Sequence, residues 1–227
     1  SQPAETIGFL QHKAGYEIPV RLRAVPVHNQ HGSIIGAVET FEEMQADTRR
    51  DRREATQRLP GYSDDLTGVA SQVLMRSYLR QTLATFVEVQ IPFSILCLRL
   101  EGLQHFRASL GPEAASSLLR VVARSLEGSL WTTDVVGRWS DDQFLVILNA
   151  CREEAMHAVR ERVRRMLAND GVEWWGERRS LPISIGEATA QPDDTIESLM
   201  ERAQKSLAAA AAGPIHSASA SRSASGS

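Results

Sequence analysis

The sequence predicts an α/β (α+β) domain in which helices flank a central sheet. Short, almost continuous apolar runs, typical of buried strands, alternate with longer segments whose apolar residues recur at helical spacing. Near residue 140 a polar turn separates two apolar runs, which predicts a β-hairpin within this sheet. The composition is that of an ordinary globular domain, with 42% hydrophobic and 23% charged residues.

Residues 1–43 are predicted to form a smaller unit of strands that precedes this domain. Residues 13–27 alternate between apolar and polar side chains for much of their length. Residues 29–32 supply turn-forming side chains, and residues 33–41 return as a second strand. We therefore expect an N-terminal β-hairpin.

Residues 44–60 are predicted to form a helical linker that ends at Pro60. Its apolar residues are too sparse for the sustained heptads of a coiled coil. Its arginines are interleaved with acidic residues, which argues against a basic strip that grips nucleic acid or anionic lipid. We expect a solvated helix with weak self-association.

The main domain is predicted over residues 61–212, with its elements in a regular order. They are a helix over 73–88, a strand over 91–100, a helix from 111, the hairpin over 134–148, a helix over 152–167, a strand over 181–186 and a last helix from Thr195. Thr195 and Ser198 supply only part of a capping box. Residues 213–227, rich in Ser, Ala and Gly, cannot bury a core and are predicted to be disordered.

The hairpin tip carries the sequence Arg138-Trp139-Ser140-Asp141-Asp142-Gln143-Phe144. It resembles the signature Arg-Tyr-Gly-Gly-Asp-Glu-Phe of the GGDEF family, the diguanylate cyclases. Residues 64–69 (DDLTGV), residues 181–186 (LPISIG) and the helix around residues 203–211 resemble further family stretches, in the same order. The resemblance covers about residues 64–212 and implies the family's ferredoxin-like, palm-type fold, with a central, mainly antiparallel sheet and flanking helices.

The N-terminal strands resemble the last strands of a PAS sensor domain. Residues 15–20 (GYEIPV) and 32–38 (GSIIGAV) carry this likeness. The part of a PAS domain that forms its pocket is absent from the sequence, so we assign no haem, flavin or other ligand site. A pair of strands is marginal alone and needs a partner surface, on its neighbour, on a second copy or on missing sequence.

The resemblance implies a metal site in active family members, where two carboxylates hold the divalent cations that carry the GTP phosphates. One of these positions aligns with Arg99, and Glu101 follows two residues later. A guanidinium cannot ligate a metal, and at about 4 Å it repels each unit of metal charge by roughly 4 kcal/mol at an effective dielectric constant of about 20. We expect Arg99 to pair with Asp142 or Asp141 in place of the metal.

The family's other functional positions are substituted as well. Ser140 and Asp141 replace the two glycines that let the backbone approach the nucleotide, and Gln143 replaces the glutamate. The remaining substitutions fall on the guanine, phosphate and inhibitory positions of the family. They are Arg107 and Ser116 for the guanine-binding pair, Ala211 for a phosphate-binding lysine, and Trp131 for the arginine of the inhibitory site, whose Asp134 is kept.

We therefore predict a bacterial signalling module that is catalytically inactive and acts through protein interaction or dimerisation. One alternative is a weak diguanylate cyclase, making cyclic-di-GMP from two GTP, with Mg²⁺ held by Glu101 and Asp142. Another is a non-catalytic GTP or cyclic-di-GMP sensor that uses Arg99, Arg107 and Arg138. We expect no catalytic residue, metal or cofactor, and Mg²⁺ with GTP only if cyclase activity remains.

Charge and hydropathy limit the partners and the location. A net charge of −3 argues against a broad grip on nucleic acid, and no apolar stretch is long enough to span a bilayer. We expect a cytoplasmic protein, and any membrane anchor would lie upstream of the chain. Its expected partners are a second copy of itself, in a homodimer, and an unidentified signalling protein.

Cys97 and Cys151 are predicted to be core thiols. Residues 172–175 (VEWW) are either an exposed interaction face or an edge strand on the core.

Overall fold

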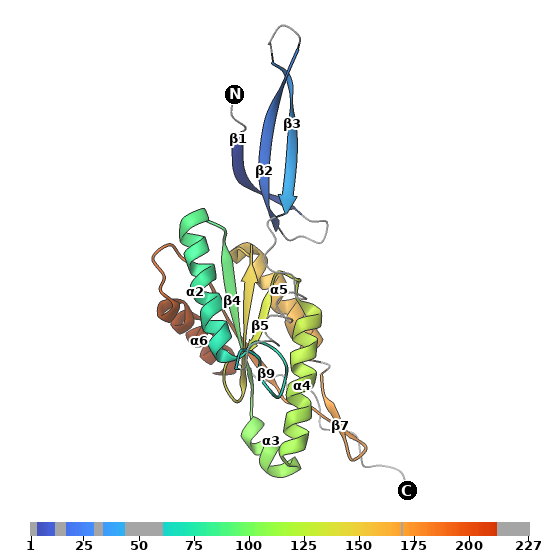
Figure 1. Cartoon of the computed structure of the whole chain (residues 1–227). Coiled ribbons are helices and arrows are strands. Elements are labelled where there is room, and N and C mark those ends of the chain that lie inside the picture. Colours follow the sequence, from blue (N-terminus) through green and yellow to red (C-terminus); the bar gives the residue numbers. More distant parts are fainter. Residues whose placement is uncertain (1–3, 12–16, 30–33, 44–60, 169, 213–227) are drawn as a thin grey trace.

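The computed structural model describes residues 4–11, 17–29, 34–43, 61–168 and 170–212 (Figure 1). The predicted linker over 44–60 and the predicted disordered tail over 213–227 lie outside the described residues. The turn of the N-terminal hairpin lies largely outside them too.

The N-terminal unit is an antiparallel sheet of three strands in the order β1-β2-β3. The strands are β1 (Ala4–Gln11), β2 (Glu17–His28) and β3 (Ile34–Glu43). The pairing of β2 with β3, with Val25 opposite Val38, confirms the predicted hairpin. Strand β1 was not predicted, because its sequence AETIGFLQ shows no sustained alternation.

The main domain is built on a four-stranded sheet in the order β5-β6-β4-β9, in which every neighbouring pair is antiparallel. Its strands are β4 (Phe93–Leu100), β5 (Val135–Arg138), β6 (Gln143–Asn149) and β9 (Ile183–Thr189). This confirms the predicted α+β class with a mainly antiparallel sheet. Strand β4 is paired on both edges, and Arg99 is its one residue that is not buried.

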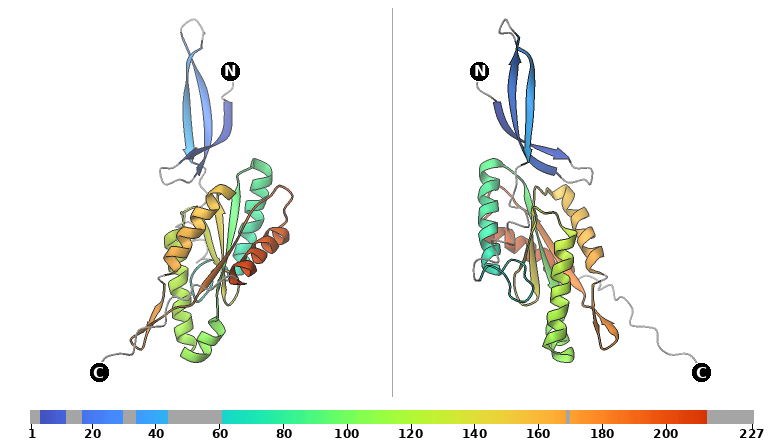
Figure 2. Two further views of the ribbon diagram at one scale, coloured as in Figure 1. Left: turned by 180° about the vertical axis from the view of Figure 1, so that it is seen from behind. Right: turned by 45° about the vertical axis from the view of Figure 1, so that its right-hand side comes forward.

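Helices cover both faces of this sheet (Figures 1 and 2). On one face lie α2 (Gln72–Val89) and α6 (Ile196–Ala212), and on the other lie α4 (Pro112–Ser129) and α5 (Glu153–Leu167). Each matches a helix that the apolar spacing predicts. The short helix α3 (Leu103–Leu110), between β4 and α4, was not predicted.

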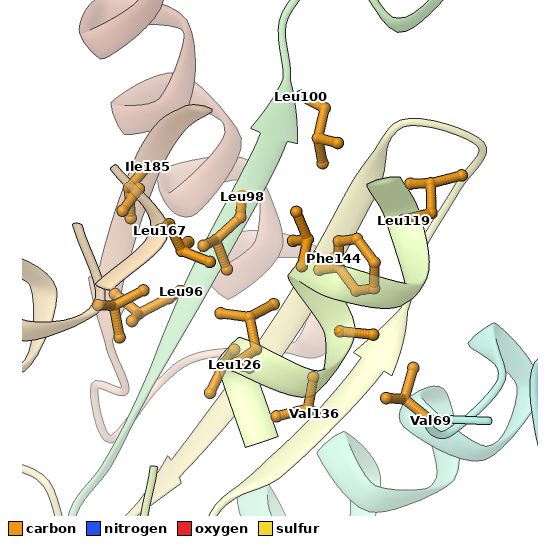
Figure 3. Close-up of a cluster of buried hydrophobic side chains, with 14 of the residues drawn as sticks. Val69, Leu96, Leu98, Leu100, Leu119, Leu126, Val136, Phe144, Leu167 and Ile185 are labelled. Atoms are coloured by element: carbon orange, nitrogen blue, oxygen red, sulfur yellow. The ribbon is translucent and has the colours of Figure 1, made fainter. Parts of the chain in front are cut away.

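Strand β4 divides the core in two because successive side chains of a strand point to opposite faces. Leu96, Leu98 and Leu100 pack with Phe144 and the leucines of α4, as Figure 3 shows. On the other face, Ile95 and Cys97 of β4 belong to a second cluster with side chains of α2 and α6.

The last helix begins with a complete capping box, although Thr195 and Ser198 match the usual capping-box sequence only in part. The hydroxyl of Thr195 accepts a hydrogen bond from the backbone N–H of Ser198 at 3.2 Å. The hydroxyl of Ser198 accepts one from the backbone N–H of Thr195 at 3.0 Å. A serine thus takes the part usually played by Glu or Gln, and α6 has a fixed start.

Residues 172–175 belong to a small hairpin and show features of both predicted alternatives, an exposed face and a strand packed on the core. It is formed by β7 (Val172–Trp174) and β8 (Glu177–Arg179). Val172 is buried and Trp174 packs partly against the core, whereas Trp175 at the tip is 92% exposed. Trp175 and Gly176 both have positive φ, as a tight two-residue hairpin turn requires.

Both cysteines are free, buried thiols, which confirms their prediction as core residues. Burial raises the pKa of Cys97 to about 12 and that of Cys151 to about 11, so neither ionises near neutral pH.

Among the described residues, no helix is both long and apolar enough to cross a membrane.

We predict that Gly186→Ala strongly destabilises the domain. A Cβ atom at this position of β9 would lie 2.2 Å from the backbone nitrogen of Leu207 and 2.4 Å from the carbonyl oxygen of Ala203. Because both atoms belong to the backbone of α6, the helix must move, at a cost of about 1–3 kcal/mol or more in unfolding free energy. Urea denaturation measures this loss.

Gly128→Ala is the matched control. Gly128 lies in α4 and a Cβ atom there meets nothing within 4 Å, so alanine should be neutral or stabilise the helix by up to about 1 kcal/mol. Equal stabilities of the two variants would contradict the close packing of α6 on β9.

We predict that the two thiols make the domain less stable as the pH rises above about 8.5, the pKa of an ordinary thiol. In the unfolded chain they lose their protons there, whereas in the folded chain they keep them up to about pH 11–12. The unfolded state therefore binds fewer protons in this window, and the free energy of unfolding falls. Below the window the thiols make no contribution to the pH dependence.

Urea denaturation of the native chain and of a Cys97→Ala/Cys151→Ala variant across this pH window isolates the effect of the thiols. Parallel curves of unfolding free energy against pH for the two chains would contradict the prediction.

Candidate functional site

The candidate site lies where β4 ends beside the tip of the β5–β6 hairpin. In the register of the sheet, Arg138 of β5 lies opposite Phe144 of β6, and Arg99 of β4 lies opposite Gln143 of β6. The tip is closed by the carbonyl of Gln143, which accepts from the backbone N–H groups of Trp139 at 2.9 Å and Ser140 at 3.2 Å. The backbone N–H of Leu100 donates to the carbonyl of Asp142 at 2.9 Å, so the end of β4 is fastened to the tip.

Arg138 holds the tip from inside. Its side chain is buried, its Nε donates to the carbonyl of Ser140 at 2.6 Å, and one of its terminal nitrogens donates to the carbonyl of Asp141. The guanidinium also lies 5.2 Å from the centre of the Phe144 ring. Burial lowers the pKa of Arg138, while the charges of Asp64 and Asp141 partly offset this effect. We conclude that Arg138 and Phe144 fix the shape of the turn.

Trp139 also packs within the fold. It lies against the core cluster of α2 and α6, and the guanidinium of Arg76 stands 4.9 Å from the centre of its ring. Trp139 therefore joins the hairpin tip to α2.

Arg99 does not pair with Asp142 or Asp141, contrary to the expectation from the sequence. Its Nε lies 3.5 Å from a carboxylate oxygen of Glu101. Both atoms are shielded from solvent and neither has a hydrogen-bond partner, so this is an ion pair without a hydrogen bond. The reason is local, since Glu101 stands in the turn just after β4, only two residues along the chain from Arg99. Glu101 therefore reaches the guanidinium before either aspartate of the tip.

Asp141 pairs instead with Arg107 of α3. The terminal nitrogen of Arg107 lies 3.5 Å from the Asp141 carboxylate, whose side chain is 73% exposed. Such an exposed pair adds little to stability, but it joins α3 to the tip. Asp142 accepts a hydrogen bond from the hydroxyl of Ser140 at 3.0 Å, within the tip itself.

Gln143 is joined to the last helix by a contact that the sequence analysis missed. The side-chain amide nitrogen of Gln204 donates to the amide oxygen of Gln143 at 3.0 Å. The resemblance places acidic residues at both positions in the family, so two amides here replace two carboxylates. The replacement of an acid by an amide at both positions is the feature of the sequence that could have pointed to a contact between Gln143 and Gln204.

The other predicted positions lie away from this network. Asp134 is a buried residue that accepts hydrogen bonds from the backbone N–H groups of Trp131 at 2.9 Å and Asn149 at 3.3 Å. The Trp131 ring stacks under Arg162 at 4.9 Å. Asp134 thus holds a turn before β5. Ser116 lies half-buried on α4, and Ala211 lies near the end of α6.

The residues at the site do not fit a divalent cation. Hard cations require several oxygen ligands, and carboxylates serve best. Here Glu101 faces the positive charge of Arg99, and one oxygen of Asp142 already accepts a hydrogen bond. Within the part of the chain that the structure describes, no group of three or more His, Cys, Asp or Glu side chains could hold a metal ion.

The family model for the diguanylate cyclase GGDEF domain matches residues 61–214. The chain belongs to the GGDEF family. Diguanylate cyclase A of Treponema denticola is 28% identical over 115 residues, which cover 50% of this chain and 31% of that protein. Diguanylate cyclase DgcP of Pseudomonas aeruginosa is 25% identical over 151 residues, covering 66% of this chain and 22% of that protein. The chain thus spans less than a third of the length of either relative.

Solved structures show the same fold. Diguanylate cyclase SiaD of Pseudomonas aeruginosa, crystallised with its activator SiaC, superposes with a TM-score of 0.65 at 23% identity, covering 72% of this chain and 64% of that one. The GGDEF domain of DgcB from Caulobacter crescentus, in complex with c-di-GMP, gives a TM-score of 0.65 at 19% identity, covering 69% of this chain and 93% of that one. At these identities the likeness establishes the fold.

We predict that Arg138→Lys lowers the free energy of unfolding by about 1–3 kcal/mol. A lysine ammonium cannot reproduce the planar fork that reaches the carbonyls of Ser140 and Asp141 at once. Urea denaturation measures the loss, with Arg124→Lys on the exposed surface of α4 as the control that keeps the same chemical change. Equal stabilities of the two variants would show that Arg138 does not hold the tip.

Proposed function

We propose that this chain is a catalytically inactive GGDEF domain that acts as a bacterial signalling module through protein interaction. The observation that carries the proposal is the ion pair of Arg99 with Glu101. It puts a permanent cation at the strand end where family cyclases need a metal ligand, and it engages a carboxylate that could otherwise bind metal. Phosphoryl transfer depends almost wholly on positioning and charge neutralisation, so losing the metal removes its main support.

Two further contacts support the proposal. The pairing of Asp141 with Arg107 sets a carboxylate and its counter-ion where the resemblance places the nucleotide phosphates and guanine. The amide bridge between Gln143 and Gln204 replaces acidic groups with neutral ones. The polar groups of the tip are thus engaged with one another, as in a site that serves shape rather than catalysis.

A second candidate is a non-catalytic sensor of GTP or cyclic-di-GMP, and one observation favours it. A terminal nitrogen of Arg138 is shielded and has no hydrogen-bond partner, and the side chains of Arg99 and Arg107 are 29% and 36% exposed. Arg99 and Arg107 could meet phosphate without any metal, whereas the buried nitrogen of Arg138 would first have to be uncovered. Weak cyclase activity, the third candidate, would need Glu101 and Asp142 to hold Mg²⁺ beside Arg99.

The input and the partners belong to the same proposal. SiaD is found with a separate activator protein, and by analogy we propose that a protein partner recognises this domain in the cytoplasm. We further propose that the N-terminal strands are the last part of a PAS sensor unit and that the chain self-associates.

The test is titration calorimetry of the chain with GTP and Mg²⁺, then with cyclic-di-GMP, followed by an assay for cyclic-di-GMP product. We expect no product, because Arg99 repels the cation that must accompany GTP. Heat from cyclic-di-GMP or GTP without product would favour the sensor instead. Product above a control without protein would overturn the proposal.

We also predict that Arg99→Asp creates measurable binding of Mn²⁺, because it adds a carboxylate beside Glu101 and removes the repelling cation. Arg80→Asp makes the same change of charge at an exposed position of α2 with no acidic residue three or four positions away, and it should leave Mn²⁺ binding absent. If both variants bind Mn²⁺ equally, net charge rather than the strand-end position governs the site, and the role given to Arg99 fails.

A further inference from the structure

The tip of the β7–β8 hairpin presents a tryptophan to solvent. Among the large hydrophobic residues that the structure describes, Trp175 is the most exposed, at 92%, whereas its neighbour Trp174 packs partly against the core. The hairpin stands out from the side of the domain beside α4 (Figures 1 and 2). A single exposed apolar side chain is common on protein surfaces, so exposure alone does not assign a role to Trp175.

The backbone at Trp175 is unfavourable for a tryptophan. Its φ of 52° lies in the left-handed region, where a bulky side chain is an outlier. A two-residue turn of this kind favours Asn or Asp in front of a glycine such as Gly176. Trp175 therefore serves neither the turn nor the core. Backbone strain that persists in a native fold is typical of functional positions, because the surrounding structure has to hold it in place.

The base of the hairpin is fastened to the domain. The hydroxyl of Ser125 on α4 donates a hydrogen bond to the carboxylate of Asp170 at 3.0 Å. A Cβ atom at Gly171 would lie 2.9 Å from the carbonyl oxygen of Arg179, so the two ends of the hairpin pass close to each other. Trp175 is thus held in a fixed position relative to α4. A side chain that is already ordered loses little conformational entropy when it binds a partner.

The charges of the hairpin balance. Glu177 and Arg179 form an ion pair, and Glu173 lies opposite Arg178 in the register of the two strands. Nucleic acids and anionic lipid surfaces attract a protein through an excess of positive charge, which this hairpin lacks. Tryptophan and arginine are instead enriched where two proteins meet. The chemistry of the tip therefore fits a protein partner better than either polyanion.

We propose that Trp175 is the anchor by which this domain docks on another protein. The indole fills an apolar pocket of that protein, and the paired charges of the hairpin meet the polar rim of the pocket. Docking of this kind removes a large apolar area from water, which drives the association. The inference rests on the protein interaction within the proposed function, but it does not depend on whether the domain turns over GTP.

A change to asparagine separates binding from folding. Asn tolerates the left-handed backbone and is favoured in front of Gly176, so Trp175→Asn should leave the stability of the full chain unchanged or raise it. Urea denaturation measures this. A loss of stability would show that Trp175 supports the fold of its own chain, and the proposal would be overturned.

Site-specific photocrosslinking identifies the partner. The full chain carries photoreactive benzoylphenylalanine in place of Trp175, and light is applied in the bacterium that carries the chain. The matched control has the same group in place of Val87, an apolar residue of α2 that is 56% exposed. We expect one defined protein, identified by mass spectrometry, to be coupled from position 175 and not from position 87.

The affinity of the purified partner completes the test. Titration calorimetry should show that this protein binds Trp175→Asn about 30-fold or more weakly than the native chain, the loss typical of a tryptophan at the centre of an interface. Val87→Ala, which trims an exposed apolar side chain elsewhere, should bind like the native chain.

Four results would overturn the proposal. They are no product specific to position 175, products with lipid in place of protein, products that join two copies of this chain, and equal affinities of the partner for Trp175→Asn and the native chain. The proposed inactivity is judged separately, by the assay for cyclic-di-GMP. Failure of the crosslink without product in that assay removes only the docking role of Trp175, and product in that assay with a specific crosslink removes only the inactivity.

Discussion

The main domain depends on one constraint, the burial of β4 between two neighbouring strands and two layers of helices. Both edges of this strand are paired, and its side chains supply both halves of the core. Such a strand can carry a charged side chain only near its end, where the helices no longer cover it. Arg99 stands at that end. The same constraint that builds the fold therefore brings Arg99 to the place where the family's cyclases need a metal ligand.

The hairpin tip is held by contacts that do not depend on a ligand. Arg138 bonds two carbonyls from within the turn, Leu100 bonds the carbonyl of Asp142, and Gln143 is joined to Gln204 on α6. These contacts keep the backbone shape of the GGDEF hairpin, although the side chains at the signature positions differ from those of the family. Such a tip fits the proposal of an inactive domain that partners recognise by its shape.

Most of the fold of the main domain could be predicted from the sequence, because apolar periodicity and the hairpin pattern record burial directly. The helix α3 and the strand β1 were missed, since short or irregular segments leave little periodicity. The partner of Arg99 was predicted wrongly, because the family resemblance pointed to the aspartates of the tip, whereas Glu101 lies only two residues along the chain. The bridge from Gln143 to Gln204 joins residues far apart in sequence, and the only sign of it there is that amides replace acidic family residues at both positions.

We propose that the end of β4 does not bind a divalent cation. To test this, Mn²⁺ is added to the isotopically labelled chain and the NMR signals of its backbone amides are recorded. Bound Mn²⁺ broadens the signals of nearby nuclei, so we expect no selective broadening at Glu101, Gly102 and Asp142, with or without GTP. Selective loss of those signals would show that a cation binds beside Arg99 and would contradict the proposed inactivity.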